Sequence, residues 1–273
     1  MPATFRDAIV IMHEFPNVTI IALVVGTLVG AIILIPAIVH RVMRIFGLSG
    51  SEHVSSGAMD ASKAIAGYAA LVISFCILEA QTNLRKAEDA ISREASIILN
   101  LDRVLLRSEE PALVNLRPTL LAYGRAVVDR EWRLLAHPHE ALHGAPEANA
   151  AFTALSRGIF AFRPQGEFQA EMFREAISLS RQLVEVREER LSNAELSLPS
   201  LFWATTAMIC VLLVALACLV TPNAGRRTEL AGIGAAIGLL LALVIILDLP
   251  FSGETAATPV AIERVLNYRF APS

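Results

Sequence analysis

Two histidines and a glutamate near the middle of the chain form a short motif that could bind a metal. His139, Glu140 and His143 follow the pattern H-E-x-x-H, in which the histidines bind zinc and the glutamate acts as general base. That chemistry needs a rigid helix, whereas Pro138 and Gly144 flank the motif and leave little more than one helical turn. We therefore interpret the motif as a polar surface loop, and we predict no enzymatic activity, no catalytic residue, no metal site and no cofactor.

The composition indicates where the chain resides. Of its 273 residues, 55% are hydrophobic and only 18% are charged, whereas soluble domains carry about a quarter charged residues. The mean hydropathy is +0.55, and the apolar residues are concentrated in uncharged runs. These features predict an integral membrane protein. The formal net charge of −3 is small, so we expect no nucleic-acid partner.

Three runs without charged residues are long enough to cross a bilayer. They cover residues 18–39, 201–220 and 230–247, and about 20 apolar residues span the hydrocarbon core. Residues 221–229 contain Pro222, Asn223 and Gly225 and predict a tight turn between the last two spans. The pairs Gly26 with Gly30 and Gly234 with Gly238 have the small-xxx-small spacing that lets helices approach closely.

A further span is shorter. Only residues 64–78 separate Lys63 from Glu79, but charges at the ends of a span cost less than charges at its centre. We predict four transmembrane helices in an all-α membrane protein. Its expected divisions are an N-terminal segment (1–17), spans one and two (18–80), a helical extramembrane region (81–198), spans three and four (199–249) and a C-terminal tail (250–273).

The region between spans two and three carries a helical pattern of its own. Leu84, Ile91, Ile98 and Leu105 recur every seven residues, which predicts that span two continues as one helix to about residue 106. Further helices are expected over residues 118–135, 148–160 and 168–196. The charged run 187–190 at the end of the last helix is interpreted as a solvated face.

Several segments resemble one protein family. They are Ala80-Gln81-Thr82-Asn83 with Arg93-Glu94-Ala95; Leu116-Arg117, Tyr123 and Glu131-Trp132; the run 187–190 with Leu198-Pro199 and Phe202-Trp203; and Asp248-Leu249-Pro250-Phe251-Ser252-Gly253. Together they resemble the bacterial DUF4239 or bestrophin-like proteins and, more remotely, the bestrophin channels. The family-motif residues expected to have structural roles are Gln81, Asn83, Asp248, Pro250, Phe251 and Gly253.

The resemblance implies a ring of identical subunits, pentameric in bestrophins, in which the second spans line a pore with an apolar neck. Val72, Cys76 and Ala80 occupy the corresponding positions, although Ala80 replaces a bulkier residue. Glu79 could present its charge at a pore mouth. The alternative for Val72 and Cys76 is packing between spans, and Asp248 is interpreted as a cap or a salt-bridge partner that orders the following turn.

Two functions remain open at this point. The first is an oligomeric ion channel, by resemblance an anion channel, in which the bilayer, other copies of the chain and inorganic ions are the partners. The second is a membrane-anchored protein-interaction or signalling module without transport activity. Basic residues flank both ends of the spans, so charge leaves the orientation unresolved. By resemblance, we expect a multi-pass protein of the cell (inner) membrane with its large helical region in the cytoplasm.

Overall fold

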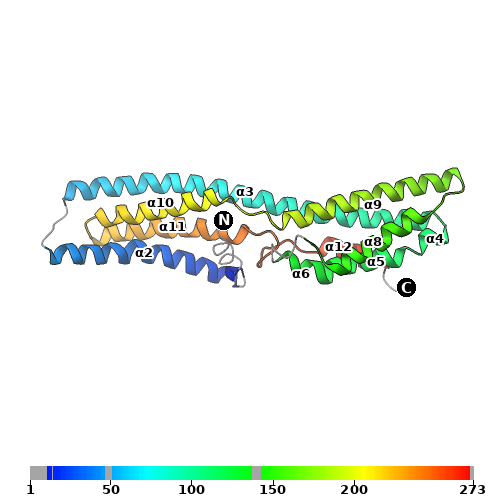
Figure 1. Cartoon of the computed structure of the whole chain (residues 1–273). Coiled ribbons are helices and arrows are strands. Elements are labelled where there is room, and N and C mark those ends of the chain that lie inside the picture. The colour runs from blue at the N-terminus through cyan, green and yellow to red at the C-terminus, as the bar shows by residue number, and fades with distance from the viewer. Residues whose placement is uncertain (1–10, 14, 47–50, 137–142, 271–273) are drawn as a thin grey trace. The chain divides into compact units, whose positions relative to one another are not determined.

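The computed structural model describes residues 11–13, 15–46, 51–136 and 143–270. Within these residues every regular element is a helix (Figure 1). In chain order they are α2 (Asn17–Ile45), α3 (Glu52–Arg107), α4 (Pro111–Val114), α5 (Arg117–Ala126), the π-helix η1 (Val127–Glu131), α6 (Trp132–Leu135), α8 (Pro146–Ala161), α9 (Glu167–Asn193), α10 (Ser200–Leu219), α11 (Ala224–Leu247) and α12 (Val260–Phe270).

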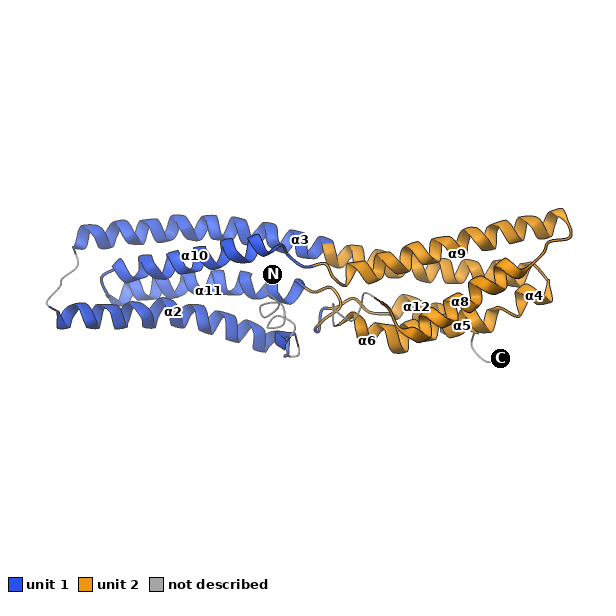
Figure 2. Ribbon diagram, in the orientation of Figure 1, with its two compact units in different colours: residues 1–82, 197–248, 253–255 blue, residues 83–196, 249–252, 256–273 orange. Residues whose placement is uncertain are grey.

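The chain forms two compact units, which are coloured separately in Figure 2. Unit 1 contains residues 1–82, 197–248 and 253–255, and unit 2 contains residues 83–196, 249–252 and 256–273. Helix α3 contributes its first part to unit 1 and its second part to unit 2.

Among the residues that the structure describes, four helices are long and apolar enough to cross a membrane, and all four lie in unit 1. These are α2, the first part of α3, α10 and α11, as predicted. Helix α11 packs extensively along α2, which also contacts α10. The turn between α10 and α11 is shorter than expected, because the Asn223 side chain accepts a hydrogen bond from the Gly225 amide (2.8 Å) and α11 already begins at Ala224. Side-chain capping of this kind satisfies an amide that a helix start leaves unpaired.

The two glycine pairs differ in what they face. A Cβ added to Gly238 would lie 2.9 Å from the Cα of Val25, and one added to Gly234 would lie 2.9 Å from the Cδ1 of Ile32. Both contacts are with α2, so this pair permits the close approach of α2 and α11. Around Gly26 and Gly30, by contrast, a Cβ would meet no described atom within 4 Å.

Unit 2 is built on the heptad stripe of α3. Ile91, Ile98 and Leu105 are at most 2% exposed and pack with apolar side chains of α5, α8 and α9 in one core. The expected continuation of α3 is confirmed, since the helix ends at Arg107. Just beyond its end, Glu109 adopts a left-handed backbone conformation with φ of 55°.

The C-terminal segment, expected as a tail, contains helix α12. Ile262 and Leu266 lie one turn apart and are buried in the core of unit 2. Arg269 donates to the Oδ2 of Asp102 (2.9 Å), while Arg117 donates to the Oδ1 of the same carboxylate (2.6 Å). Ala261, Val265 and Phe270 are partly buried against the same core, so this segment packs as a helix of unit 2.

Helix packing in unit 1 can be tested with Gly238→Ala. The new methyl group would meet the backbone of α2, and overpacking of this kind costs about 1–3 kcal/mol. We expect a lower melting temperature for the detergent-solubilised protein, measured by circular dichroism. Gly232→Ala is the matched control on the same helix, because no described atom lies within 4 Å of its added Cβ. Equal melting temperatures for the two variants would contradict the packing described here.

Candidate functional site

One face of the membrane part of α3 has no partner among the described residues of unit 1. Tyr68, Leu71, Phe75 and Leu78 follow one another at steps of three or four residues, and each is more than half exposed. Since such steps keep side chains on one side of a helix, these residues form a continuous stripe, which we call the α3 stripe.

The residues predicted to line a pore fall on different faces of α3. Glu79 is exposed and Val72 is half-buried. Cys76 and Ala80 are 2% and 1% exposed, so their side chains point into the helix packing of unit 1. Because each residue turns an α-helix by about 100°, the predicted set 72, 76 and 80 is rotated by one residue from the set that faces outward.

The outward face of α3 is not purely apolar. Ser74 is exposed, although its hydroxyl donates to the Ala70 carbonyl (2.7 Å), and the carboxylate of Glu79 follows on the same side. The most apolar window of α3 has a hydropathy of 1.8, against 2.4 or more for the other three spans. This span therefore has the weakest preference for lipid.

A second group of functional candidates lies in unit 2, where four charged side chains form a buried network. Arg190 is completely buried and donates to the Oε2 of Glu94 and to the Oε1 of Glu131, both at 2.6 Å. Arg187 forms an ion pair with Glu131. The hydroxyl of Tyr123 donates to the Oε1 of Glu94 (2.5 Å). Two carboxylates and two guanidinium groups thus balance in charge.

Local backbone features bring these groups together. Glu131 ends the π-helix η1, a rare conformation that shifts the side chains following it. The amide of Ala145 donates to the Oε2 of Glu131 (2.9 Å). Gly144 has φ of 58°, and a Cβ at this position would lie 2.6 Å from both Glu131 and Arg187. Glycine is therefore required here by backbone conformation and by space.

The network shifts the pKa of its members. Burial acts to raise the pKa of Glu131, but the charges of Arg190 and Arg187 outweigh it, and the pKa lies below its usual value. Burial, supported by the charge of Glu94, raises the pKa of Tyr123 well above its usual value. Burial also acts to lower the pKa of Arg190, and the two carboxylates raise it instead. The glutamate and the arginine therefore remain charged, and the tyrosine remains neutral.

The solvated face predicted for residues 187–190 is wrong for its two arginines. Leu183, Arg187 and Arg190 lie at steps of four and three, and Leu183 is completely buried. Similarly, Glu94 lies three residues after Ile91 and four before Ile98 on the heptad stripe. In both helices a charged residue occupies a position that the periodic pattern otherwise fills with apolar residues. This placement is the feature of the sequence that indicates a buried charge.

The first two family-motif residues, Gln81 and Asn83, lie two residues apart on α3 and differ in burial. Gln81 is exposed at the end of the unit 1 part of α3, whereas Asn83 is 4% exposed and accepts a hydrogen bond from the Lys86 ammonium (3.5 Å) in unit 2. Neither residue belongs to the buried charge network, although both lie in the segment that resembles the family.

Asp248 acts on the backbone. It is 2% exposed, and its Oδ1 accepts a hydrogen bond from the Leu198 amide (2.7 Å). This contact ties the end of α11 to the segment before α10, within unit 1.

The residues after Asp248 form a turn with separate contacts. Pro250 is buried, and Phe251 meets Trp132 edge to face, with 5.6 Å between the ring centroids, in unit 2. Gly253 has φ of 84°, and a Cβ at this position would lie 3.0 Å from His13 in unit 1. Glycine thus fits a conformation that other residues rarely adopt.

The H-E-x-x-H motif cannot be described as a unit. His139 and Glu140 lie outside the described residues, and the His143 side chain is exposed. Within the ranges that the structure does describe, no three His, Cys, Asp or Glu side chains gather as metal ligands would.

These features define an α-helical membrane protein with four spans and a long helical extramembrane region between spans two and three. Residues 61–262 match the Bestrophin-like domain. The chain therefore belongs to the bestrophin-like family, which confirms the resemblance seen in the motifs. No curated protein matches the chain.

Solved structures show the same fold. A mutant of a bacterial bestrophin homologue from Klebsiella pneumoniae aligns with a TM-score of 0.58 at 14% identity, over 92% of this chain and 99% of that chain. A second mutant of this homologue aligns with a TM-score of 0.55 at 15% identity, again over 92% and 99%. A structure described as a membrane protein gives 0.57 at 15% identity, over 94% and 99%.

The contribution of the network to stability can be tested with Arg190→Leu. Removing one partner of a buried ion pair leaves uncompensated charge and costs about 3–5 kcal/mol. We expect a large decrease in the free energy of unfolding, measured by denaturant titration in detergent. Arg181→Leu on the same helix is the control, since Arg181 is exposed. A loss as small as that of the control would show that the network does not stabilise unit 2.

The raised pKa of Tyr123 predicts a dependence on alkaline pH. A group with a raised folded-state pKa contributes its full stability below its unfolded pKa, about 10 for tyrosine, and loses it as the pH rises further. We expect Tyr123→Phe to reduce the loss of melting temperature above pH 10. Tyr268→Phe, at a side chain that is 81% exposed, should leave the loss of melting temperature above pH 10 unchanged. The same loss in the wild type and in Tyr123→Phe would refute this role.

Proposed function

We propose that the chain forms a homo-oligomeric ion channel whose pore is lined by the α3 stripe. By family resemblance the conducted ions are anions. The observation that carries the proposal is the outward face of α3, where Leu71 and Phe75 stand beside Ser74 and Glu79.

The outward face of α3 is more stable in contact with water than in contact with lipid. A carboxylate at the end of a span costs less than one at its centre, but it is still more stable beside water than beside hydrocarbon. The other three spans are more apolar and suit lipid contact better. When several copies of α3 surround one axis, Glu79 and Ser74 face water in the shared lumen.

The apolar members of the stripe then form the constriction. Rings of Leu71 and Phe75 could gate ions by dewetting. Val72 lies at the edge of this lining and Glu79 at its end, where a ring of carboxylates attracts cations rather than anions. The assignment of anions rests on the family resemblance alone. Cys76 and Ala80 pack behind the stripe and support the helix within its own subunit.

The remaining assignments also rest on the family. We propose a pentameric assembly in the cell (inner) membrane, with the large helical region in the cytoplasm. The structural roles proposed for the family-motif residues are supported by their contacts: Asp248 holds the Leu198 amide in unit 1, and Phe251 packs on Trp132 in unit 2.

A second function, binding of a protein partner without transport, is favoured by a different observation. Unit 2 exposes the large apolar side chains of Leu106, Phe160 and Phe168, each by 45% or more. Exposed apolar groups outside a membrane can mark interaction sites. An ion flux measurement distinguishes the two functions.

The channel proposal can be tested by chloride efflux from liposomes that contain the purified protein. We expect efflux from the wild type and a severalfold higher rate for Phe75→Ala, because the smaller side chain widens the constriction. Cys76→Ala is the neighbouring control, and its rate should match the wild type because Cys76 is buried.

Two results would contradict the proposal. One is the absence of flux through a well-folded oligomer, which would favour the interaction module. The other is a monomeric mass in detergent, since a single copy of α3 cannot surround a pore.

A further inference from the structure

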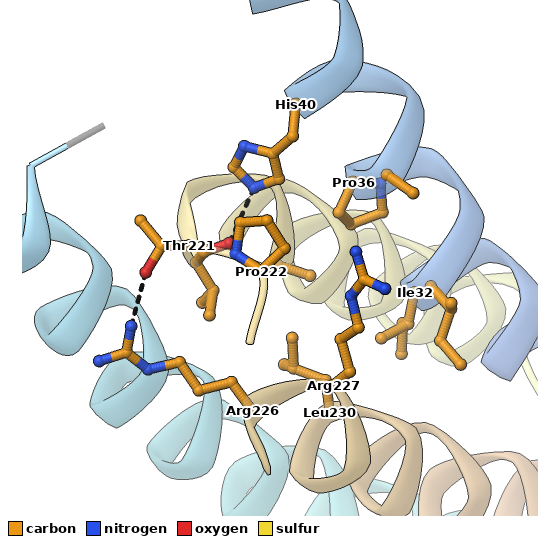
Figure 3. Close-up of a pocket in the computed structure, with 12 residues that line it drawn as sticks. Ile32, Pro36, His40, Thr221, Pro222, Arg226, Arg227 and Leu230 are labelled. Atoms are coloured by element: carbon orange, nitrogen blue, oxygen red, sulfur yellow. Dashed lines mark hydrogen bonds between the residues drawn. The ribbon is translucent and has the colours of Figure 1, made fainter. Parts of the chain in front are cut away.

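A small pocket in unit 1 lies between α2 and the turn that joins α10 to α11 (Figure 3). The space enclosed in it is small, about 20 Å³, so a larger group would lie partly across its opening. One wall is apolar and includes Ile32, Ile33 and Leu230, while the rim carries His40, Thr221 and Arg227. The pocket is therefore amphipathic.

The two neighbouring arginines at this site differ in their partners. Arg226 donates to Ser55 (3.0 Å), to Thr221 and to Glu52. The Arg227 side chain makes no hydrogen bond or ion pair with the described residues, and Figure 3 shows its guanidinium group directed toward Pro36 on α2. A guanidinium group offers five N–H donors, so Arg227 can bind an anion without breaking a contact.

Further positive charge lies at the end of α2 that carries His40, on residues that do not themselves line the pocket. Arg41 and Arg44 near the end of α2 are exposed, and neither forms an ion pair with any residue that the structure describes. The acidic groups at this end are engaged or distant from the pocket. Glu52 is bound to Arg226, Glu229 lies 3.2 Å from Lys63, and Asp60 is on α3, which contributes no residue to the lining.

The pocket lies at the level where the spans meet the lipid headgroups. Arg41 and Arg44 follow the uncharged run 18–39, and Arg227 precedes the uncharged run 230–247. The arginines therefore lie where a span meets the headgroup region, while Ile32 and Leu230 lie deeper along the same helices. Basic residues at this level attract anionic lipids.

The rim is held in place by backbone contacts. A carbonyl oxygen can only accept, so the Nε2–H of His40 donates to the Val220 carbonyl (2.8 Å). The amide of Thr221 donates to the Ser55 hydroxyl (2.8 Å). The backbone beside Arg227 is therefore ordered before any ligand arrives, and the conformational entropy cost of binding falls mainly on the Arg227 side chain.

We propose that this pocket binds the phosphate of an anionic phospholipid. Arg227 donates to the phosphate oxygens, Arg41 and Arg44 supply additional positive potential, and the first carbons of an acyl chain lie along Ile33 and Leu230. A free phosphate ion would use the arginine but not the apolar wall, so the geometry favours a lipid over a soluble anion. The proposal does not depend on ion conduction.

The test uses the full chain, delipidated in a non-ionic detergent. Binding of phosphatidylglycerol is measured by native mass spectrometry and by the increase in melting temperature, with phosphatidylcholine and inorganic phosphate as comparison probes. We expect phosphatidylglycerol to bind and stabilise most. Arg227→Ala should weaken this binding roughly tenfold, because a charge-assisted hydrogen bond to phosphate is lost.

Arg163→Ala is the matched control. It removes one exposed arginine from unit 2 and should leave lipid binding unchanged. If Arg227→Ala does not fold, Arg227→Gln retains most of the side chain without its charge and should show the same loss. Unchanged binding in a folded Arg227 variant would overturn the proposal. Equal stabilisation by inorganic phosphate or by phosphatidylcholine would also overturn it.

Discussion

The arrangement of unit 2 depends on the burial of one positive charge. Arg190 has no exposed surface, and it sits between the carboxylates of Glu94 and Glu131. A buried charge without partners is far more costly than a neutral residue. Helices α3, α9 and the π-helix η1 must therefore come together at the same place, and Gly144 must approach without a side chain.

The network also explains how α3 and α9 find one register. A stripe of apolar residues with a seven-residue repeat can pack in several positions displaced by two turns, with similar burial in each. Only one of these positions places Arg190 against Glu94 and Glu131. A displaced pairing would leave three charges unsatisfied in an apolar core, so charge gives specificity where apolar packing alone would not.

The sequence predicted correctly those features that depend on one helix alone. The four spans and the long α3 follow from uncharged length and from periodicity, which are local properties. Prediction from the sequence failed where the burial of a side chain depends on a residue in another helix. The burial of Arg187 depends on Glu131, which is 56 residues away, and the outward face of α3 depends on which side α10 and α11 cover. The motif resemblance found the segments that form the network, but not the contact among them.

The unbroken course of α3 limits how its sequence can change. The helix has 56 residues, and within its unit 2 part the buried carboxylates of Glu94 and Asp102 are separated by a fixed number of residues. Inserting a single residue between them would turn one relative to the other by about 100°. Homologous chains should therefore differ in this segment by substitution, with insertions and deletions confined to the connections between helices.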